Sequence, residues 1–295
     1  MKAALLSDRG VVKVAGGDAQ KFLDGLVTAD LDKVTAGNAR YAALLTPQGK
    51  IIADFIIVKA DEENHYFLDC PGALAPTLTQ RLNFYKLRAK VIVEDLSETL
   101  GVMAIWDGAG SNGPGLCYAD PRLPALGRRC MMSTHIGGKA TALELGATLL
   151  DAAGYEAHRI ALGVPRGGSD FLYNDAFPHE ADMDQLGGVD FDKGCFVGQE
   201  VVSRMEHRGT ARTRVVPVAF DGPSPEAGVS VRAGGSTLGM MGSGTIGRGL
   251  AALRLDRVAD AMANATPMIA GGITIRPVKP GWARFPWPGE ANAAE

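Results

Sequence analysis

From about residue 210 onward the chain is a series of short β-type runs separated by glycine and proline, and this texture constrains the fold more than any other feature. The runs are RTRVVPVAF, VSVRA, GTIGR, LAALRL and ITIRPVK. Several short strands at regular spacing predict a small barrel or sandwich. We therefore place a small barrel or sandwich at residues 210–284 and, after it, a flexible tail of small residues, Pro and Gly at 285–295.

The preceding residues mix strand and helix patterns. Asp18 stands where it could cap a helix that places Phe22, Leu23, Leu26 and Val27 on one face. ARYAALLTPQGKIIADFIIVK holds two apolar runs joined by Thr-Pro-Gln-Gly, which predicts a β-hairpin because Pro presets φ and Gly closes the turn. LELGATLLDAAGYEAHRIALG is typical of a helix. This order favours an α+β fold with parts at 1–97 and 98–209 over a regular βαβ repeat.

Composition limits the partners that the chain can recruit. The 295 residues are enough for about two domains, and the formal net charge is −3. No overall basic field attracts nucleic acid or anionic lipid. No stretch approaches the roughly 20 apolar residues of a membrane span, and MKAALLSDRG lacks the apolar core of a secretory signal. We therefore expect no membrane partner and no strong general nucleic-acid binding, and we leave the oligomeric state open with a monomer as the simplest case.

The four cysteines are spaced irregularly, at Cys70, Cys117, Cys130 and Cys195. With no C-x-x-C pair, they argue against a dedicated metal site, so we predict none. Free thiols also favour a cytoplasmic, reducing compartment.

Residues 192–204, DKGCFVGQEVVSR, are the stretch that most directly indicates chemistry. Gly194 and Gly198 bracket Cys195, and the residues that follow have helical spacing. A helix N-terminus and the positive charge of Lys193 would both lower the pKa of the thiol and make it reactive. The alternative is that Cys195 is a small buried apolar residue, as most free cysteines are.

Just downstream, MEHRGTARTR carries Arg208, Arg212 and Arg214, with Arg204 before it. These arginines could bind a phosphate, a carboxylate or an RNA backbone, or they could simply be solvated at the start of a strand.

The octapeptide KGCFVGQE resembles the K-G-C-[FY]-x-G-Q-E signature of the YgfZ family of folate-binding proteins, which are relatives of the glycine-cleavage T-protein. GGDAQKFLDGLVTADLDKV, YAALLTPQGKIIADF, RIALGVPRGGSD and FPHEADMDQL are similar to family segments in the same order, so the resemblance covers nearly the whole chain. It implies interleaved α/β N-terminal parts plus a C-terminal β-barrel, with tetrahydrofolate or a derivative bound in a central opening.

The same resemblance assigns roles to individual residues. Glu180 would accept the paired N–H groups of the pterin edge, and Arg204 would bind the anionic glutamate tail. Gln199 and Glu200 would position Cys195 beside the cofactor. Tyr41, Phe177 or Phe191 could provide an aromatic wall, and the sequence does not choose among them.

One position departs from the T-protein pattern. T-proteins carry two adjacent acids after the hairpin turn, whereas this chain has Ala53 and then Asp54. Aminomethyl transfer needs a positioned proton acceptor or donor, for which only Asp54 remains. The loss of that acid argues against glycine-cleavage activity. The resemblance therefore implies a folate-binding accessory protein for assembly or repair of iron–sulfur clusters in client enzymes, including tRNA-modifying ones, and leaves catalytic turnover open. A folate-dependent aminomethyltransferase or demethylase and an RNA-binding adaptor are the alternatives.

Overall fold

The computed structural model describes residues 1–108, 113–209 and 211–290. The chain forms two compact units, and each is described here by itself. The first unit comprises residues 1–156 and 186–199, and the second comprises residues 157–185 and 200–295. The chain thus passes between the units three times, whereas we placed the domain boundaries at 97/98 and 209/210.

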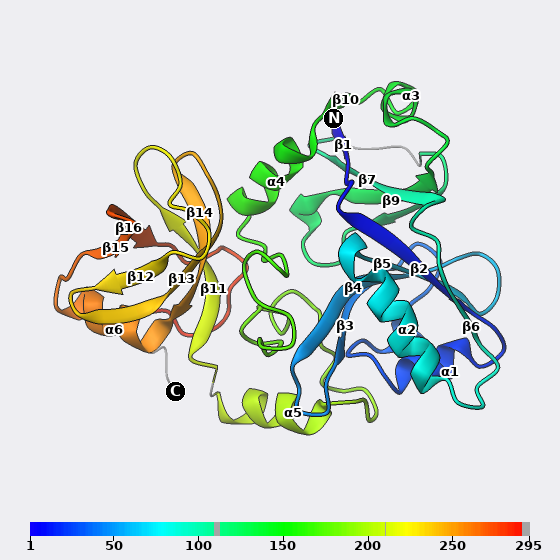
Figure 1. Cartoon of the computed structure of the whole chain (residues 1–295), viewed down its shortest axis with the longest axis horizontal. Helices are drawn as coiled ribbons and strands as arrows, with labels where there is room; N and C mark the ends of the chain where they lie inside the picture. The colour runs from blue at the N-terminus through cyan, green and yellow to red at the C-terminus, as the bar shows by residue number, and fades with distance from the viewer. Residues whose placement is uncertain (109–112, 210, 291–295) are drawn as a thin grey trace. The chain divides into compact units, whose positions relative to one another are not determined.

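The first unit contains two five-stranded sheets, and strands from both ends of its sequence interleave in them (Figure 1). One sheet has the order β3 (Arg40–Leu45), β4 (Ile51–Lys59), β5 (His65–Pro71), β2 (Arg9–Ala15), β6 (Ile92–Asp95). The other has the order β10 (Thr148–Leu150), β1 (Lys2–Leu5), β7 (Leu100–Trp106), β9 (Arg128–Ser133), β8 (Leu116–Ala119). Short 3-10 turns lie at Leu31–Lys33, Gly72–Leu74 and Pro124–Leu126.

The predicted hairpin and the first predicted helix are both present. β3 and β4 pair antiparallel across the Thr-Pro-Gln-Gly turn. Helices α1 (Ala19–Asp24) and α2 (Ala75–Tyr85) bury Leu23, Leu78 and Leu82 in one core with the β3–β6 sheet. In Figure 1, α2 lies against β2 and β6. Asp18 precedes α1, but its carboxylate accepts the backbone N–H of Lys90 at 2.7 Å instead of capping the helix.

The long helix that we predicted near residues 143–163 is wrong in its first half. The structure has α3 (Gly138–Glu144), then strand β10, and then α4 (Ala152–Ala161). β10 pairs parallel with β1 at the start of the chain. This pairing joins residues far apart in sequence, so no local pattern signals it.

The second unit is built around the C-terminal barrel, which confirms the predicted fold class. Its closed order is β11 (Thr213–Ala219), β14 (Arg248–Arg254), β13 (Ser236–Thr245), β12 (Ser230–Ala233), β15 (Met268–Ala270), β16 (Ile273–Pro277). α5 (Gln199–Arg208) precedes the barrel, as predicted, and α6 (Leu255–Ala263) packs on its core. Phe285 and Trp287, which we placed in a tail, also pack against that core. Within the described ranges, no helix has both the length and the hydrophobicity to cross a bilayer.

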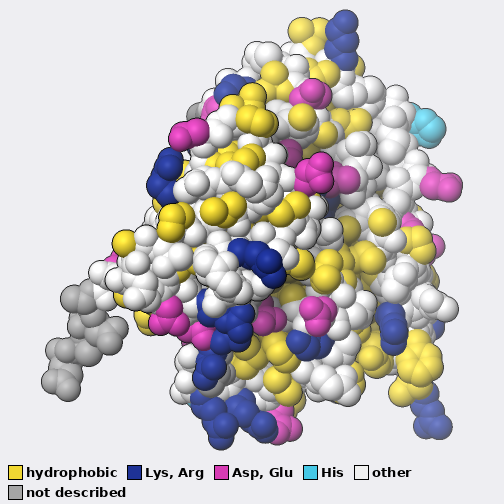
Figure 2. Space-filling view, turned by 60° about the vertical axis from the view of Figure 1, so that its left-hand side comes forward, with side chains coloured by type: hydrophobic (Ala, Val, Ile, Leu, Met, Phe, Trp, Pro, Cys, Tyr) yellow, Lys and Arg dark blue, Asp and Glu magenta, His cyan; other side chains and the backbone are white. Residues whose placement is uncertain are grey.

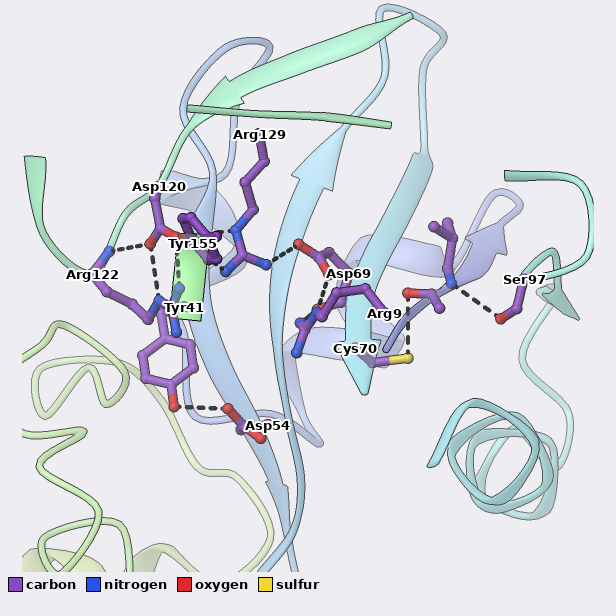
Figure 3. Close-up of polar contacts among 12 residues, drawn as sticks. Arg9, Tyr41, Asp54, Asp69, Cys70, Ser97, Asp120, Arg122, Arg129 and Tyr155 are labelled. Carbon is purple, nitrogen blue, oxygen red and sulfur yellow. Dashed lines mark hydrogen bonds and ion pairs between the residues drawn. The ribbon is translucent and has the colours of Figure 1, made fainter. Parts of the chain in front are cut away.

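A buried ionic network joins the two sheets of the first unit (Figure 3). Asp69 on β5 accepts hydrogen bonds from Arg9 on β2 and Arg129 on β9, both at 2.6 Å. The Tyr118 hydroxyl on β8 donates to the same carboxylate at 2.8 Å. Asp120 accepts from Arg129 at 3.1 Å and from Arg122 at 2.9 and 2.6 Å. No local sequence pattern indicated this network.

The charges in the network compensate one another. Asp69 is fully buried, and burial alone would raise its pKa. Arg9 and Arg129 outweigh that effect and hold the pKa of Asp69 below its ordinary value. Asp120 likewise has a lowered pKa, because Arg122 and Arg129 outweigh its burial. These carboxylates therefore remain charged and stabilise the fold near neutral pH.

We predict that Asp69→Asn lowers the free energy of unfolding at pH 7 by about 3 kcal/mol, because it leaves two buried guanidinium groups undercompensated. Since the pKa of Asp69 is lower in the folded state, its stabilising contribution is present above the unfolded-state pKa of about 4 and is lost as the pH falls below that. When urea unfolding is measured from about pH 7 to pH 3, the free energy of unfolding should fall less steeply with decreasing pH in Asp69→Asn than in wild type. Asp61→Asn, at an exposed site, should match wild type. If the free energy of unfolding fell equally steeply with decreasing pH in Asp69→Asn and wild type, the prediction would be contradicted.

Candidate functional site

Cys195 carries the one exposed free thiol in the described part of the chain. Cys117 and Cys130 face each other across β8 and β9 and form a disulfide, a pairing that the sequence spacing did not indicate. Cys70 is buried, and burial raises its pKa to about 12. The structure therefore favours the accessible alternative for Cys195 over a role in core packing.

Lys193 anchors the loop that carries this thiol. Its ammonium group donates to the backbone carbonyls of Asp24, Val27 and Ala29 at 2.6, 2.8 and 2.9 Å, just past the end of α1. The Asp24 carboxylate lies 3.3 Å away, and the Phe196 ring centroid lies at 5.2 Å. Burial lowers the pKa of Lys193, and Asp24 partly offsets this effect. The three N–H donors are thus all used within the unit, which gives Lys193 a positioning role that the sequence did not reveal.

Gly198 seats the other end of the loop on the β3–β4 hairpin. Its φ is +82°, a conformation that strains any residue with a side chain. A Cβ there would lie 2.6 Å from the carbonyl oxygen of Thr46 and 3.1 Å from Cα of Gly49. Phe196 is buried, and Val197 packs against the core below the hairpin. The loop is therefore fixed on both sides of Cys195, while the sulfur itself stays exposed.

The hairpin also holds Asp54 and Tyr41. The Tyr41 hydroxyl donates to the Asp54 carboxylate at 2.9 Å, and both side chains are buried (Figure 3). Burial, followed by the charge of Asp54, raises the pKa of Tyr41. The Arg122 guanidinium lies 5.7 Å from the centroid of the Tyr41 ring, so this ring offers no open face within the unit. Ala53 points into the opposite, apolar core.

In the second unit, Glu180 borders a cavity of about 350 Å³. The lining residues are Phe177, Glu180, Val201, Met205, Ala211, Arg212, Thr213 and Arg254. One Glu180 carboxylate oxygen accepts the backbone N–H of Phe177 at 2.9 Å, and the Glu180 carbonyl accepts the N–H of Val215 on β11. These bonds hold the carboxylate at the cavity wall.

The arginines that we singled out near this cavity have different surroundings. Arg204 is ion-paired with Glu200 one helical turn away at 2.5 Å, so two predicted ligand residues bind each other. Arg214 is buried and donates to both oxygens of Asp184 at 2.6 and 2.9 Å. Arg212 lies in the cavity wall and has no ion pair within the described residues.

His179, Asp184 and Glu206 could together offer three metal-ligand atoms, all within 4.8 Å of one another. His179 Nε2 lies 2.9 Å from the Glu206 carboxylate. However, Asp184 already neutralises Arg214, and a cation bound here would have to lie beside that guanidinium. The cluster is explained as an ion-pair network around the start of the barrel.

The predicted site residues fall into two groups, one in each unit. The first unit contains Tyr41, Asp54, Lys193, Cys195 and Gln199, and the second contains Glu180, Glu200 and Arg204. Arg212 was noted in the sequence only as part of a basic stretch. Its place in the cavity wall follows from its position directly before β11, next to residues that are distant in the sequence.

The side chains of the second-unit cavity suit a folate. A pterin edge needs a carboxylate acceptor, and Glu180 keeps acceptor capacity beyond its bond to the Phe177 N–H. The flat ring needs an apolar or aromatic wall, which Phe177, Val201 and Met205 supply. The anionic tail needs a cation, and Arg212 is the one in this wall without an ion pair among described residues.

Comparison with known families matches both ends of the chain. The family model described as the GCVT N-terminal domain matches residues 6–112, and the one described as the CAF17 C-terminal beta-barrel domain matches residues 212–285. The structure is similar to the crystal structure of glycine cleavage system aminomethyltransferase T from Bartonella henselae, with a TM-score of 0.75 and 16% identity over 97% of this chain and 87% of that one. This likeness shows the fold.

Relatives similar in sequence carry the name iron-sulfur cluster assembly factor IBA57, mitochondrial, or its homolog. The Homo sapiens protein is 31% identical over 281 residues, which cover 86% of this chain and 77% of that protein. The Mycosarcoma maydis homolog is 36% identical over 233 residues, which cover 74% of this chain and 57% of that protein. The chain spans only about half to three-fifths of the length of such fungal relatives.

These findings confirm the GCVT-like fold with a CAF17-type barrel, but the relatives are named IBA57 rather than YgfZ. They also contradict the cytoplasmic prediction, because the relatives are named as mitochondrial proteins. That prediction rested on cysteine spacing and on the lack of a secretory signal. Neither property distinguishes the cytoplasm from the interior of an organelle.

We predict that Gly198→Ala destabilises the protein by about 2 kcal/mol, because it forces a Cβ against Thr46 at a left-handed φ. It should also change the rate at which a thiol reagent labels Cys195. Gly194→Ala is the matched control, since a Cβ there meets no atom within 4 Å and its φ is not left-handed. Urea unfolding and the labelling rate check both effects. Equal stability of the two variants would show that the loop does not depend on the hairpin.

Proposed function

Because the chain belongs to the family of the iron-sulfur cluster assembly factor IBA57, we propose that it is an accessory protein for assembly or repair of iron–sulfur clusters in client enzymes. The observation that carries this proposal is the exposed thiol of Cys195 on a loop fixed at both ends. A thiolate is the usual protein ligand of such clusters. The likeness of KGCFVGQE to the YgfZ signature supports the same residue, and the clients would include tRNA-modifying enzymes.

The cluster is cargo in this proposal, and Cys195 supplies one ligand to it. Clusters normally take four protein ligands, so a partner must supply the others. The disulfide and the burial of Cys70 leave no second available thiol in the described part of the chain. Lys193 and Gly198 act as positioning residues, because they fix the backbone on either side without using the sulfur.

The second unit supports a folate site as a further part of this function. Glu180 would accept from the pterin edge, Phe177 would lie against the ring, and Arg212 would bind the glutamate tail. Arg212 replaces Arg204 in that role because Arg204 is already paired with Glu200. When bound, tetrahydrofolate would supply one-carbon chemistry, and these residues would orient it.

The alternatives have weaker support. For aminomethyl transfer, Ala53 lies in the apolar core where T-proteins carry an acid, and the Asp54 carboxylate accepts the Tyr41 hydroxyl. For an RNA-binding adaptor, Arg204 and Arg214 are already ion-paired. On the face drawn in Figure 2, Lys and Arg side chains lie beside Asp and Glu side chains, so this face is not uniformly basic.

We predict that Cys195→Ser fails to restore cluster-dependent enzyme activities in a deletion strain, whereas wild type restores them. Serine keeps the size of the side chain but removes the soft sulfur ligand. Cys70→Ala, which removes the buried thiol, should complement as well as wild type if its expression level is matched. The readouts are one cluster-dependent dehydratase and one cluster-dependent tRNA modification. Full complementation by Cys195→Ser would overturn the proposed role of the thiol.

We predict that tetrahydrofolate binds saturably in calorimetry and that Glu180→Gln weakens its affinity by at least about tenfold, since a charged acceptor is lost. Arg212→Gln should weaken it as well. Glu226→Gln, an exposed acid on a barrel loop, should not change it. Equal affinity in Glu180→Gln and wild type would move the folate site elsewhere and would leave the thiol proposal unaffected.

A further inference from the structure

The end of α2 and the turn after it carry strongly exposed apolar side chains on a cationic segment. Phe84 is 76% exposed and Leu87 is 88% exposed, although Leu78 and Leu82 on the same helix are buried. Ile92, where β6 begins, is 60% exposed. Burying such side chains is favourable, so their exposure indicates a surface that contacts an apolar environment.

Leu87 also adopts a backbone conformation that does not suit it. Its φ is +41°, in the left-handed region that favours glycine. It directly follows the last helical turn, where Lys86 N–H donates to the Leu82 carbonyl and Ala89 N–H donates to the Lys86 carbonyl. Glycine is the common residue at such a helix end. In the isolated chain, Leu87 neither packs against the core nor adopts a favourable φ. A contact with an external apolar surface would account for a large apolar residue at this position.

The segment that carries Phe84, Leu87 and Ile92, here called the apolar tip, is positively charged. Residues 71–93 contain no Asp or Glu, while Arg81, Lys86, Arg88 and Lys90 all fall in this stretch. None of these four cations forms a salt bridge with another described residue. The nearby Asp18 carboxylate accepts the backbone N–H of Lys90 at 2.7 Å and offsets at most one of the four charges. The tip therefore keeps a positive charge although the whole chain carries −3.

We propose that this tip docks on an anionic phospholipid bilayer. Exposed apolar side chains on a segment that carries four cations match the boundary between acyl chains and anionic headgroups. A protruding tip suits that boundary better than it suits RNA, whose bases stack on aromatic rings but gain little from an aliphatic Leu87. Because the rest of α2 packs inward and no described helix can cross a bilayer, the contact is peripheral. It revises the expectation of no membrane partner, which rested on net charge and on the lack of a membrane-spanning stretch.

Vesicle co-sedimentation of the purified full chain tests the proposal. Wild type should sediment with vesicles of phosphatidylcholine containing about 30% phosphatidylglycerol, and binding should fall about tenfold with pure phosphatidylcholine or in about 0.5 M NaCl. Leu87→Gly should lower the bound fraction severalfold while its thermal midpoint stays unchanged or rises, because glycine relieves the left-handed φ. A merely structural Leu87 would instead lower the midpoint. Arg88→Gln combined with Lys90→Gln should weaken binding as well.

Ile246→Gly is the matched control, because Ile246 is 81% exposed on the turn between β13 and β14. It should sediment like wild type. Equal sedimentation of Leu87→Gly and wild type, or no wild-type binding to anionic vesicles, overturns the proposal. Binding of wild type to single-stranded RNA but not to vesicles would assign the tip to nucleic acid instead. None of these outcomes depends on Cys195, so failure of the membrane proposal would leave the proposed function of the thiol untouched.

Discussion

Two buried carboxylates hold three guanidinium groups between the sheets of the first unit, and the rest of that unit depends on this compensation. Asp69 and Asp120 neutralise Arg9, Arg122 and Arg129. Moving an unpaired ion out of water costs several kcal/mol, so any other alignment of the sheets would leave a costly charge. Apolar packing alone tolerates small shifts, whereas bidentate arginine contacts do not. The network therefore selects one arrangement of the two sheets among the many that hydrophobic burial would allow.

A short series of contacts connects the ionic network to the loop that carries the exposed thiol of Cys195. Arg122, fixed by Asp120, lies against the ring of Tyr41, and the Tyr41 hydroxyl binds Asp54. Both Tyr41 and Asp54 belong to the β3–β4 hairpin, whose turn supports Gly198. Cys195 thus stands on a hairpin that the ionic network holds in place. The sulfur is therefore exposed while the backbone on either side of it is anchored by buried groups and not by contacts to the sulfur.

Local signals in the sequence predicted the elements with local causes. The Thr-Pro-Gln-Gly turn, α5 and strands β11, β12, β14 and β16 follow from turn residues and periodicity. The run GTIGR, which we expected to be a strand, instead spans the turn between β13 and β14. Most of the structural misses involve long-range contacts. β10 pairs with the first strand of the chain, Lys193 reaches carbonyls more than 160 residues away, and the Arg–Asp network joins four strands. A single charged residue in a sequence is normally expected at the surface in contact with water. Only the fold shows which charged residues are buried and paired.

A single exposed thiol on a rigid loop is better suited to sharing a cluster than to storing one. A storage site would gather its four ligands within one chain, and here the other cysteines are bonded or buried. An incomplete ligand set binds weakly alone and gains strength only when a partner completes it, so cargo can leave when the partner does. Fixing the loop beforehand reduces the ordering entropy that each encounter must overcome. Lys193 meets this requirement because, among the described residues, its ammonium group binds backbone carbonyls, Asp24 and the Phe196 ring, and leaves the sulfur accessible to the partner that the proposal requires.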